Sequence, residues 1–575
     1  MQVFEKENWL YMRCTSSHFT QGFFGAVILA GWLSSGSVEA QSDLSPVPEK
    51  PGGDLSPVPE YPMGSPVRPE IVLPPVKQEA DAPLSAQVNI AVRHIQLSGG
   101  TIFSSGQLTQ ITAPYEGREI TTDDLQRLRR ELTLYYVNHG YINSGAVIPD
   151  QKVADGVVRI DLVEGSLVEI KVKGNTSLRD SYIRNRLVLH DGKPLHLPTL
   201  QEQIALLHQD RLIKRIDAHL VPGLRRGEAI LEVTVEEQKP YAFGFSFNNR
   251  RSPSVGELRG EIWGSYLSVF GYGDAVTFRY GMTEGLNDVG VDYSLPLNGR
   301  GTRLGTSVSR SDSAIIEKPF DSIDISSETE NVGIELSHPF WQRLDGYFRG
   351  SVRLDRRYSK TVFLQDEPYP SPGSENGKST VAVLRLGQEW LSRRRARVLA
   401  LRSRFSFGVD AFGATINRGD VPDGRFTAWL GQFQWVQRLS EKGSQLVART
   451  DLQLANKSLL PLEQFGIGGA SSVRGYRENL LVRDSGWVGS LEIRVPVAGR
   501  KLQVAAFYDV GGGKNVTGPS PKLRDISSVG LGVRWSPARY VYGQLYWGYA
   551  LKDVDVDKDK SLQDSGFHFR LDVQI

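Results

Sequence analysis

The chain has 575 residues, with 67 lysines and arginines against 65 aspartates and glutamates, and a formal net charge of +2. A chain of this length is expected to hold several domains, and its balanced charge without a basic stripe argues against a nucleic-acid partner. Glycine (59 residues) and aromatic residues (9%) are frequent, which favours strands with tight bends. The single cysteine, Cys14, lies in a segment expected to be removed, so disulfides, thiolate metal sites and cysteine catalysis are excluded.

Residues 1–40 are predicted to be an export signal peptide. The run 22–33 is apolar and has the length of a signal h-region, and residues 38–40 are typical of a small-residue cleavage site. The apolar run is shorter than the ~18 residues that a membrane-anchoring helix needs. We therefore expect the protein to leave the cytoplasm.

Residues 41–87 are predicted to be a proline-rich linker. The sequence Asp-Leu-Ser-Pro-Val-Pro-Glu occurs at 43–49 and again at 54–60, and prolines continue to Pro83. Because proline lacks an amide hydrogen and fixes φ, this stretch cannot hold a helix. An extended spacer is expected.

Residues 88–239 alternate short strands with amphipathic helices, and they do so twice. This pattern predicts two small α+β domains, at 88–165 and at 166–239. In the first domain, strands predicted over 90–97 and 157–165 flank a helix that is capped by Thr122-Asp123-Asp124. One face of that helix carries the apolar residues Leu125, Leu128, Leu132 and Tyr136.

The second domain has the same plan. Strands predicted over 168–172 and 230–237 flank a helix that begins at Pro198. The apolar face of this helix is formed by Leu200, Ile204 and Leu207.

Residues 240–575 lack helical patterns and alternate polar with apolar residues between clusters of Gly, Asn, Asp and Pro. Sixteen strands are predicted, starting near 243, 258, 273, 287, 302, 328, 344, 379, 396, 425, 443, 486, 501, 528, 540 and 566. Short turns alternate with long polar loops between them, as in transmembrane β-barrels of outer membranes. The fold class predicted for the chain is an all-β, 16-stranded transmembrane β-barrel preceded by two small α+β domains. A soluble β-sandwich or propeller is the alternative. It would not explain the regular alternation of short turns with long loops, or the export signal.

Two motifs in the barrel segment suggest a functional site. The loop 457–485, external by the strand count, is rich in glycine and carries Val473, Arg474, Gly475 and Tyr476. Because alternate residues of a strand share a face, Phe507, Asp509 and Gly511 are predicted to face the lumen, together with the possible lumen charges Glu492, Arg494 and Lys501. If the loop folds inward, Arg474 could form a bidentate pair with Asp509. The equal alternative is that both are ordinary charges of a porin.

The two motifs resemble the signature motifs of an outer-membrane protein superfamily that includes barrel assembly insertases and two-partner secretion transporters. The repeats at 88–239 resemble POTRA domains, and having two of them resembles the two-partner secretion (TpsB) branch, which contains the haemolysin and filamentous-haemagglutinin transporters. The resemblance covers about 88–575. It implies that Arg474 is the loop-tip arginine, that Asp509 is its wall partner, and that Phe507 and Gly511 shape the docking site beside Tyr476.

The resemblance implies a transporter that needs no catalytic residue, cofactor or metal. A large, unfolded, adhesin- or haemolysin-like exoprotein would add as a strand to a POTRA sheet edge in the periplasm. It would then cross the outer membrane through a monomeric barrel. Because the linker is too rich in proline to form a plug helix, the loop 457–485 would be the only gate.

Other functions stay open at this point. An assembly factor that inserts other barrels would use the same parts, although such factors usually carry more than two POTRA domains. A passive porin would leave the domains at 88–239 without a role, and an enzyme is disfavoured because no activated nucleophile is visible.

Overall fold

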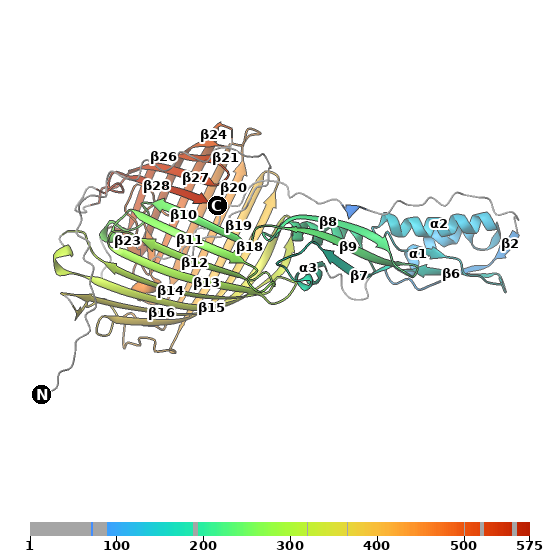
Figure 1. Ribbon diagram of the computed structural model, residues 1–575, viewed down its shortest axis with the longest axis horizontal. Helices are drawn as coiled ribbons and strands as arrows, with labels where there is room; N and C mark the ends of the chain where they lie inside the picture. Colours follow the sequence, from blue (N-terminus) through green and yellow to red (C-terminus); the bar gives the residue numbers. More distant parts are fainter. Residues whose placement is uncertain are drawn as a thin grey trace. The chain divides into compact units, whose positions relative to one another are not determined.

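The computed structural model describes residues 71–72, 89–187, 194–318, 320–364, 366–499, 501–517, 523–554 and 561–575 (Figure 1). The predicted signal peptide at 1–40 and most of the predicted linker at 41–87 lie outside the described residues. Within the linker, β1 (Ile71–Val72) pairs in parallel with β8 (Ile213–Pro222). At this point the linker takes part in a sheet, where the sequence predicted only an extended spacer.

The first α+β region is built around helix α2 (Thr122–Asn138). Thr121 caps this helix by accepting the amide hydrogen of Asp124, and the buried face is the predicted one. The other elements are β2 (Asn89–Val92), β3 (His94–Ser98), α1 (Ser105–Thr112), a 3₁₀ turn (Ala113–Tyr115), β4 (Arg118–Thr121), β5 (Gly145–Val147) and β6 (Val157–Val163). Strands β3, β6 and β5 form one sheet, and β2 pairs with β4.

One predicted strand of this region is divided in two. The alternation over 90–97 predicts a single strand, but the chain breaks at Arg93 between β2 and β3. The carbonyl of Gly156 accepts amide hydrogens from both Arg93 and His94, so the backbone turns there and each half pairs with a different strand.

The second α+β region repeats this plan. It contains β7 (Ser166–Lys173), α3 (Asp180–Leu187), α4 (Leu197–His208), β8 and β9 (Glu228–Glu237), with the sheet order β1-β8-β9-β7. Helix α4 buries the predicted residues Leu200, Ile204 and Leu207. The hydrophobic core of this region is separate from that of the first.

A glutamate closes each α+β region in the same way. Glu164, directly after β6, accepts the backbone amide hydrogens of Thr101 and Ile102 at 2.7 and 2.8 Å. Glu237, the last residue of β9, accepts that of Leu178 at 2.9 Å, among others. In both regions the end of the last strand therefore fixes the loop that follows the first long strand.

This contact predicts a pH dependence. Burial alone would raise the pKa of Glu164, but the hydrogen bonds from Thr101 and Ile102 hold it below the ordinary value. A lowered pKa in the folded state stabilises the fold above the carboxylate's unfolded pKa, and the stabilisation is lost as the pH falls through the folded pKa. We expect Glu164→Ala to destabilise the region by about 1 kcal/mol at neutral pH.

Hydrogen exchange of the segment 99–103 in the full-length protein measures this effect. Exchange should be faster in Glu164→Ala than in the wild type at neutral pH, and the difference should shrink in acid. Glu119→Ala, which removes an exposed glutamate of β4, serves as the control. Equal exchange in both variants would contradict the assigned role.

The remaining chain forms a closed antiparallel barrel of sixteen strands, which confirms the predicted fold class (Figure 1). The barrel strands are β10 (Tyr241–Asn248), β11 (Arg259–Leu267), β12 (Ala275–Met282), β13 (Leu286–Pro296), β14 (Arg303–Ala314), β15 (Ser326–Arg343), β16 (Gly346–Phe363), β18 (Lys378–Arg394), β19 (Arg397–Val409), β20 (Thr427–Arg438), β21 (Gln445–Ala455), β24 (Ser485–Ala498), β25 (Leu502–Lys514), β26 (Asp525–Ala538), β27 (Val541–Ala550) and β28 (Phe567–Gln574). The short β17 (Glu367–Pro368) lies along β16. Each strand begins close to its predicted start; the largest difference is at β26, predicted at 528.

The barrel closes where β10 pairs with β28. Along β25, Val504 and Tyr508 point outward and are 41% and 45% exposed, whereas Phe507 and Asp509 point inward and are buried. Alternation therefore gives the wall an apolar outer face and a polar lumen. Among the described residues, no helix is long and apolar enough to cross a membrane.

Candidate functional site

The connection between β21 and β24 folds into the barrel. It contains a 3₁₀ turn (Pro461–Glu463) and a hairpin of β22 (Phe465–Ile467) and β23 (Leu481–Arg483). A buried apolar cluster joins this loop to inward-facing wall residues; its members are Leu430, Phe465, Ile467, Val473, Tyr476, Leu481, Val488 and Ile526. Packing against the inner wall keeps the loop inside the lumen.

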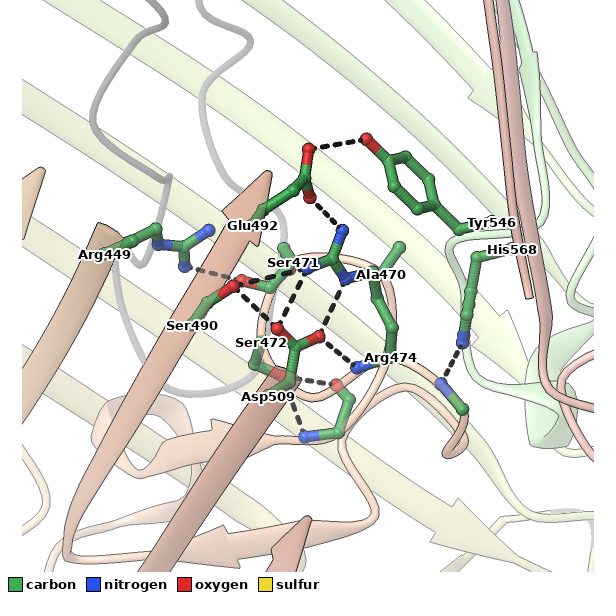
Figure 2. A network of polar contacts seen from close by, with 12 residues as sticks. Arg449, Ala470, Ser471, Ser472, Arg474, Ser490, Glu492, Asp509, Tyr546 and His568 are labelled. Carbon is green, nitrogen blue, oxygen red and sulfur yellow. Dashed lines mark hydrogen bonds and ion pairs between the residues drawn. The ribbon is translucent and has the colours of Figure 1, made fainter. Parts of the chain in front are cut away.

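Arg474, at the tip of this loop, is bound to Asp509 of β25 (Figure 2). Its Nε and Nη2 donate to the two carboxylate oxygens at 2.7 and 2.9 Å, and its backbone amide donates to the same group at 3.1 Å. Its Nη1 also pairs with Glu492 of β24. Arg474 is 7% exposed and Asp509 is 0% exposed, so water does not screen this interaction.

Aromatic rings fix the plane of the Arg474 guanidinium. Its central carbon lies 3.6 Å from the ring centre of Phe507 and 4.7 Å from that of Tyr546. The Tyr546 hydroxyl also donates to Glu492 at 3.0 Å. Stacking together with a bidentate pair requires a planar fork, which a lysine does not offer.

The glycines of both motifs permit close approach. Gly475 has a φ of 91°, and a Cβ there would lie 2.8 Å from the Gly548 carbonyl oxygen. Its amide hydrogen is donated to Nε2 of His568 at 3.1 Å. A Cβ at Gly511 would lie 2.9 Å from Ile467 of the inserted hairpin. Neither position has room for a side chain.

The other predicted residues take separate positions. Tyr476 is buried, and its hydroxyl donates to the carbonyl of Ser527 at 2.8 Å. Glu492 and Arg494 face the lumen and pair with each other at 2.5 Å. Lys501 does not line the lumen as predicted: it lies in the turn before β25 and is exposed. The strand begins one residue later than the alternation suggested, so Lys501 is not part of the alternating wall.

A second buried network, which sequence reasoning missed, anchors the stem of the loop. Glu463 accepts hydrogen bonds from Arg385 of β18 at 2.8 and 3.1 Å and from Arg357 of β16 at 3.0 Å. Arg385 is held in turn by Asp355 at 2.9 Å. Strand alternation could have placed both arginines in the lumen, but no local pattern marks Glu463 as their partner.

The network around Arg474 is balanced in charge. Two carboxylates, Asp509 and Glu492, face two guanidiniums, those of Arg474 and Arg494. Buried ions persist only when they are paired, and loss of one partner leaves the other uncompensated. Within the described ranges, no group of acidic, histidine or cysteine side chains could hold a metal ion. The arrangement can therefore act as a latch that keeps the loop tip in place.

The close contact between Gly475 and Gly548 allows the position of the loop tip to be tested. Gly475→Ala should displace the tip, because the new Cβ meets the backbone of Gly548 in a strained conformation. We expect faster hydrogen exchange over 468–480, while the heat-modifiable gel shift of the folded barrel is kept. Gly413→Ala is the matched control, since Gly413 has a φ of 77° but open space around it. Unchanged exchange in Gly475→Ala would contradict the seating described.

A closed barrel of sixteen antiparallel strands with an apolar outer face, preceded by α+β regions, has the architecture of an outer-membrane β-barrel protein. The family model for the haemolysin secretion/activation protein ShlB/FhaC/HecB matches residues 227–535, more than half of the chain. The model for the POTRA domain, ShlB-type, matches residues 90–165. The chain therefore belongs to the ShlB/FhaC/HecB family, the TpsB transporters of two-partner secretion, which confirms the resemblance.

Curated relatives and solved structures agree. The heme/hemopexin transporter protein HuxB of Haemophilus influenzae (strain 86-028NP) is 23% identical over 80% of this chain and 82% of its own length. The hemolysin transporter protein ShlB of Serratia marcescens is 24% identical over 70% of this chain and 72% of its own. The structure of CdiB from Escherichia coli has a TM-score of 0.64 at 21% identity and covers 87% of this chain and 93% of that one; it shows a shared fold.

Family membership settles the location and the class of activity. The barrel lies in the outer membrane with the POTRA region in the periplasm, as the sequence predicted. Members of the family are transporters and not enzymes.

Proposed function

We propose that this transporter captures a large, unfolded exoprotein through its POTRA domains and conducts it through the barrel lumen to the cell surface. The partner is expected to be adhesin- or haemolysin-like, and the loop 457–485 is the gate. The observation that carries the proposal is the latch itself: Arg474 bound to Asp509 and Glu492 inside the lumen. A loop that a buried ion pair holds inside the lumen is placed where a gate has to act.

The sheets of the α+β regions offer sites for capture. Strands β3 and β5 are the edges of the first sheet, and β7 is an edge of the second. An edge strand presents unpaired backbone groups that an extended peptide can complete. The pairing of β1 with β8 supports this mode, since an extended segment already adds to one of these sheets.

The barrel supports passage through the lumen and not sideways into the membrane. Strands β10 and β28 pair from Gly244–Gln574 to Asn248–Arg570. Phe243 and Ile575 exchange two further backbone hydrogen bonds, at 3.1 and 2.8 Å. This sealed seam favours transport over the alternative, an assembly factor that releases other barrels by lateral opening. Folding of the partner outside the cell could drive export, because the sequence carries no nucleotide-binding motif.

Arg474→Ala tests the gate. Secretion of the cognate exoprotein should fall at least about tenfold, because loss of a buried charge partner disrupts the seated loop. The amount secreted into the medium and the amount of folded barrel in outer membranes are measured together. Arg418→Ala, which removes an exposed arginine of another external loop, is the matched control. Wild-type secretion by Arg474→Ala would remove the proposed role of the loop.

Deletion of 88–239 tests capture. The barrel has its own closed strand network, so it should still assemble and conduct ions in planar bilayers. Secretion should be lost because the docking edges are gone. Export at the wild-type level would contradict docking at these domains.

A further inference from the structure

A second arginine, Arg477, lies three residues after Arg474 in the loop. Arg477 donates from Nε and Nη2 to the two carboxylate oxygens of Asp564 at 2.5 and 2.8 Å. Its Nη1 donates to Glu317 at 2.5 Å. The side chains of Arg477 and Asp564 are both 10% exposed. One guanidinium thus bridges two carboxylates in a site largely shielded from solvent.

The two carboxylates belong to different external loops. Glu317 lies between β14 and β15, the fifth and sixth barrel strands, and Asp564 lies between β27 and β28, the last two. Arg474, by contrast, is bound to β24 and β25, the twelfth and thirteenth strands. In a barrel of sixteen strands, the fifth and thirteenth are on opposite sides. The tip is therefore tied to one wall through Arg474, to a loop of the facing wall through Glu317, and to the nearby loop between the last two strands through Asp564.

The loop that carries Asp564 is itself fixed to the tip and to the segment that follows the first barrel strand, β10. Gln563 is fully buried and accepts the amide hydrogen of Glu478 at 2.8 Å. Its Nε2 donates to the carbonyls of Asn249 and Arg251 at 2.7 and 2.6 Å. Arg477 therefore acts within a continuous network over the mouth of the barrel, and not as a solvated surface pair.

We infer that Arg477, Asp564 and Glu317 form an outer lock that holds the external loops over the pore and has to open together with the Arg474 latch. The inference rests on the proposed role of this loop as the gate. Only Gly475 and Tyr476 separate the two arginines, so withdrawal of the tip breaks both sets of pairs, and loss of either set lowers the free energy that opening costs. Without Arg477, Asp564 and Glu317 become neighbouring like charges, which favours separation of their loops.

Planar-bilayer recordings of the full-length protein test the outer lock. Arg477→Gln should raise the fraction of time spent open by about tenfold, between the effects of an exposed and a fully buried ion pair. Asp564→Asn should raise it less, because the Arg477–Glu317 pair remains, and the double variant should match Arg477→Gln, in which the Asp564 pair is already lost. Arg418→Gln is the matched control. Every variant is first required to show the heat-modifiable shift of a folded barrel.

The outcomes separate the outer lock from the gate. If Arg477→Gln stays closed like the wild type while Arg474→Ala opens, the outer lock is wrong and the gate stands. If neither variant opens more often, the gate itself is wrong. If the effects of Arg477→Gln and Asp564→Asn add, the two residues do not act as a pair, which also overturns the outer lock.

Discussion

The structure depends on one constraint: charges inside a narrow, low-dielectric lumen must be paired. Asp509 and Glu492 face inward because strand alternation leaves them no other side. Their charge is compensated by Arg474, which enters from the loop and packs against the rings of Phe507 and Tyr546. The loop is held inside by the same requirement that governs any buried ion, and its glycines serve to let the backbone reach that position.

The loop is bound differently along its length. Its stem is held by Glu463 and by apolar packing of the hairpin on the wall. Its tip depends more on charged hydrogen bonds, around Arg474 and Arg477. Apolar contacts are non-directional and tolerate small movements, whereas bidentate ion pairs are lost when their geometry is lost. Movement of the tip alone would suit the proposed gate, because the hairpin packing and the Glu463 pairs would keep the loop near its closed position.

Much of this architecture could be predicted because period-two alternation is a local signal. It located all sixteen barrel strands and placed Asp509, Glu492 and Arg494 in the lumen. Alternation failed at Lys501, because there the exact start of a strand decides whether the side chain faces the lumen. The pairing of Glu463 with Arg385 could not be predicted, because it joins residues 78 positions apart that share no motif. The same holds for β1, whose partner strand lies far along the chain.

For the proposed gate, the presence of arginine at the loop tip limits what can trigger opening. A guanidinium does not lose its proton in proteins, so neither Arg474 nor Arg477 can be discharged. What can replace their carboxylate partners is another chain that supplies acceptors of its own. An extended polypeptide offers one backbone carbonyl per residue. These carbonyls could accept hydrogen bonds from the arginines one after another, in place of the carboxylates. In the proposed transport pathway, an unfolded exoprotein would therefore release the loop itself, by exchanging its own hydrogen bonds with Arg474 and Arg477.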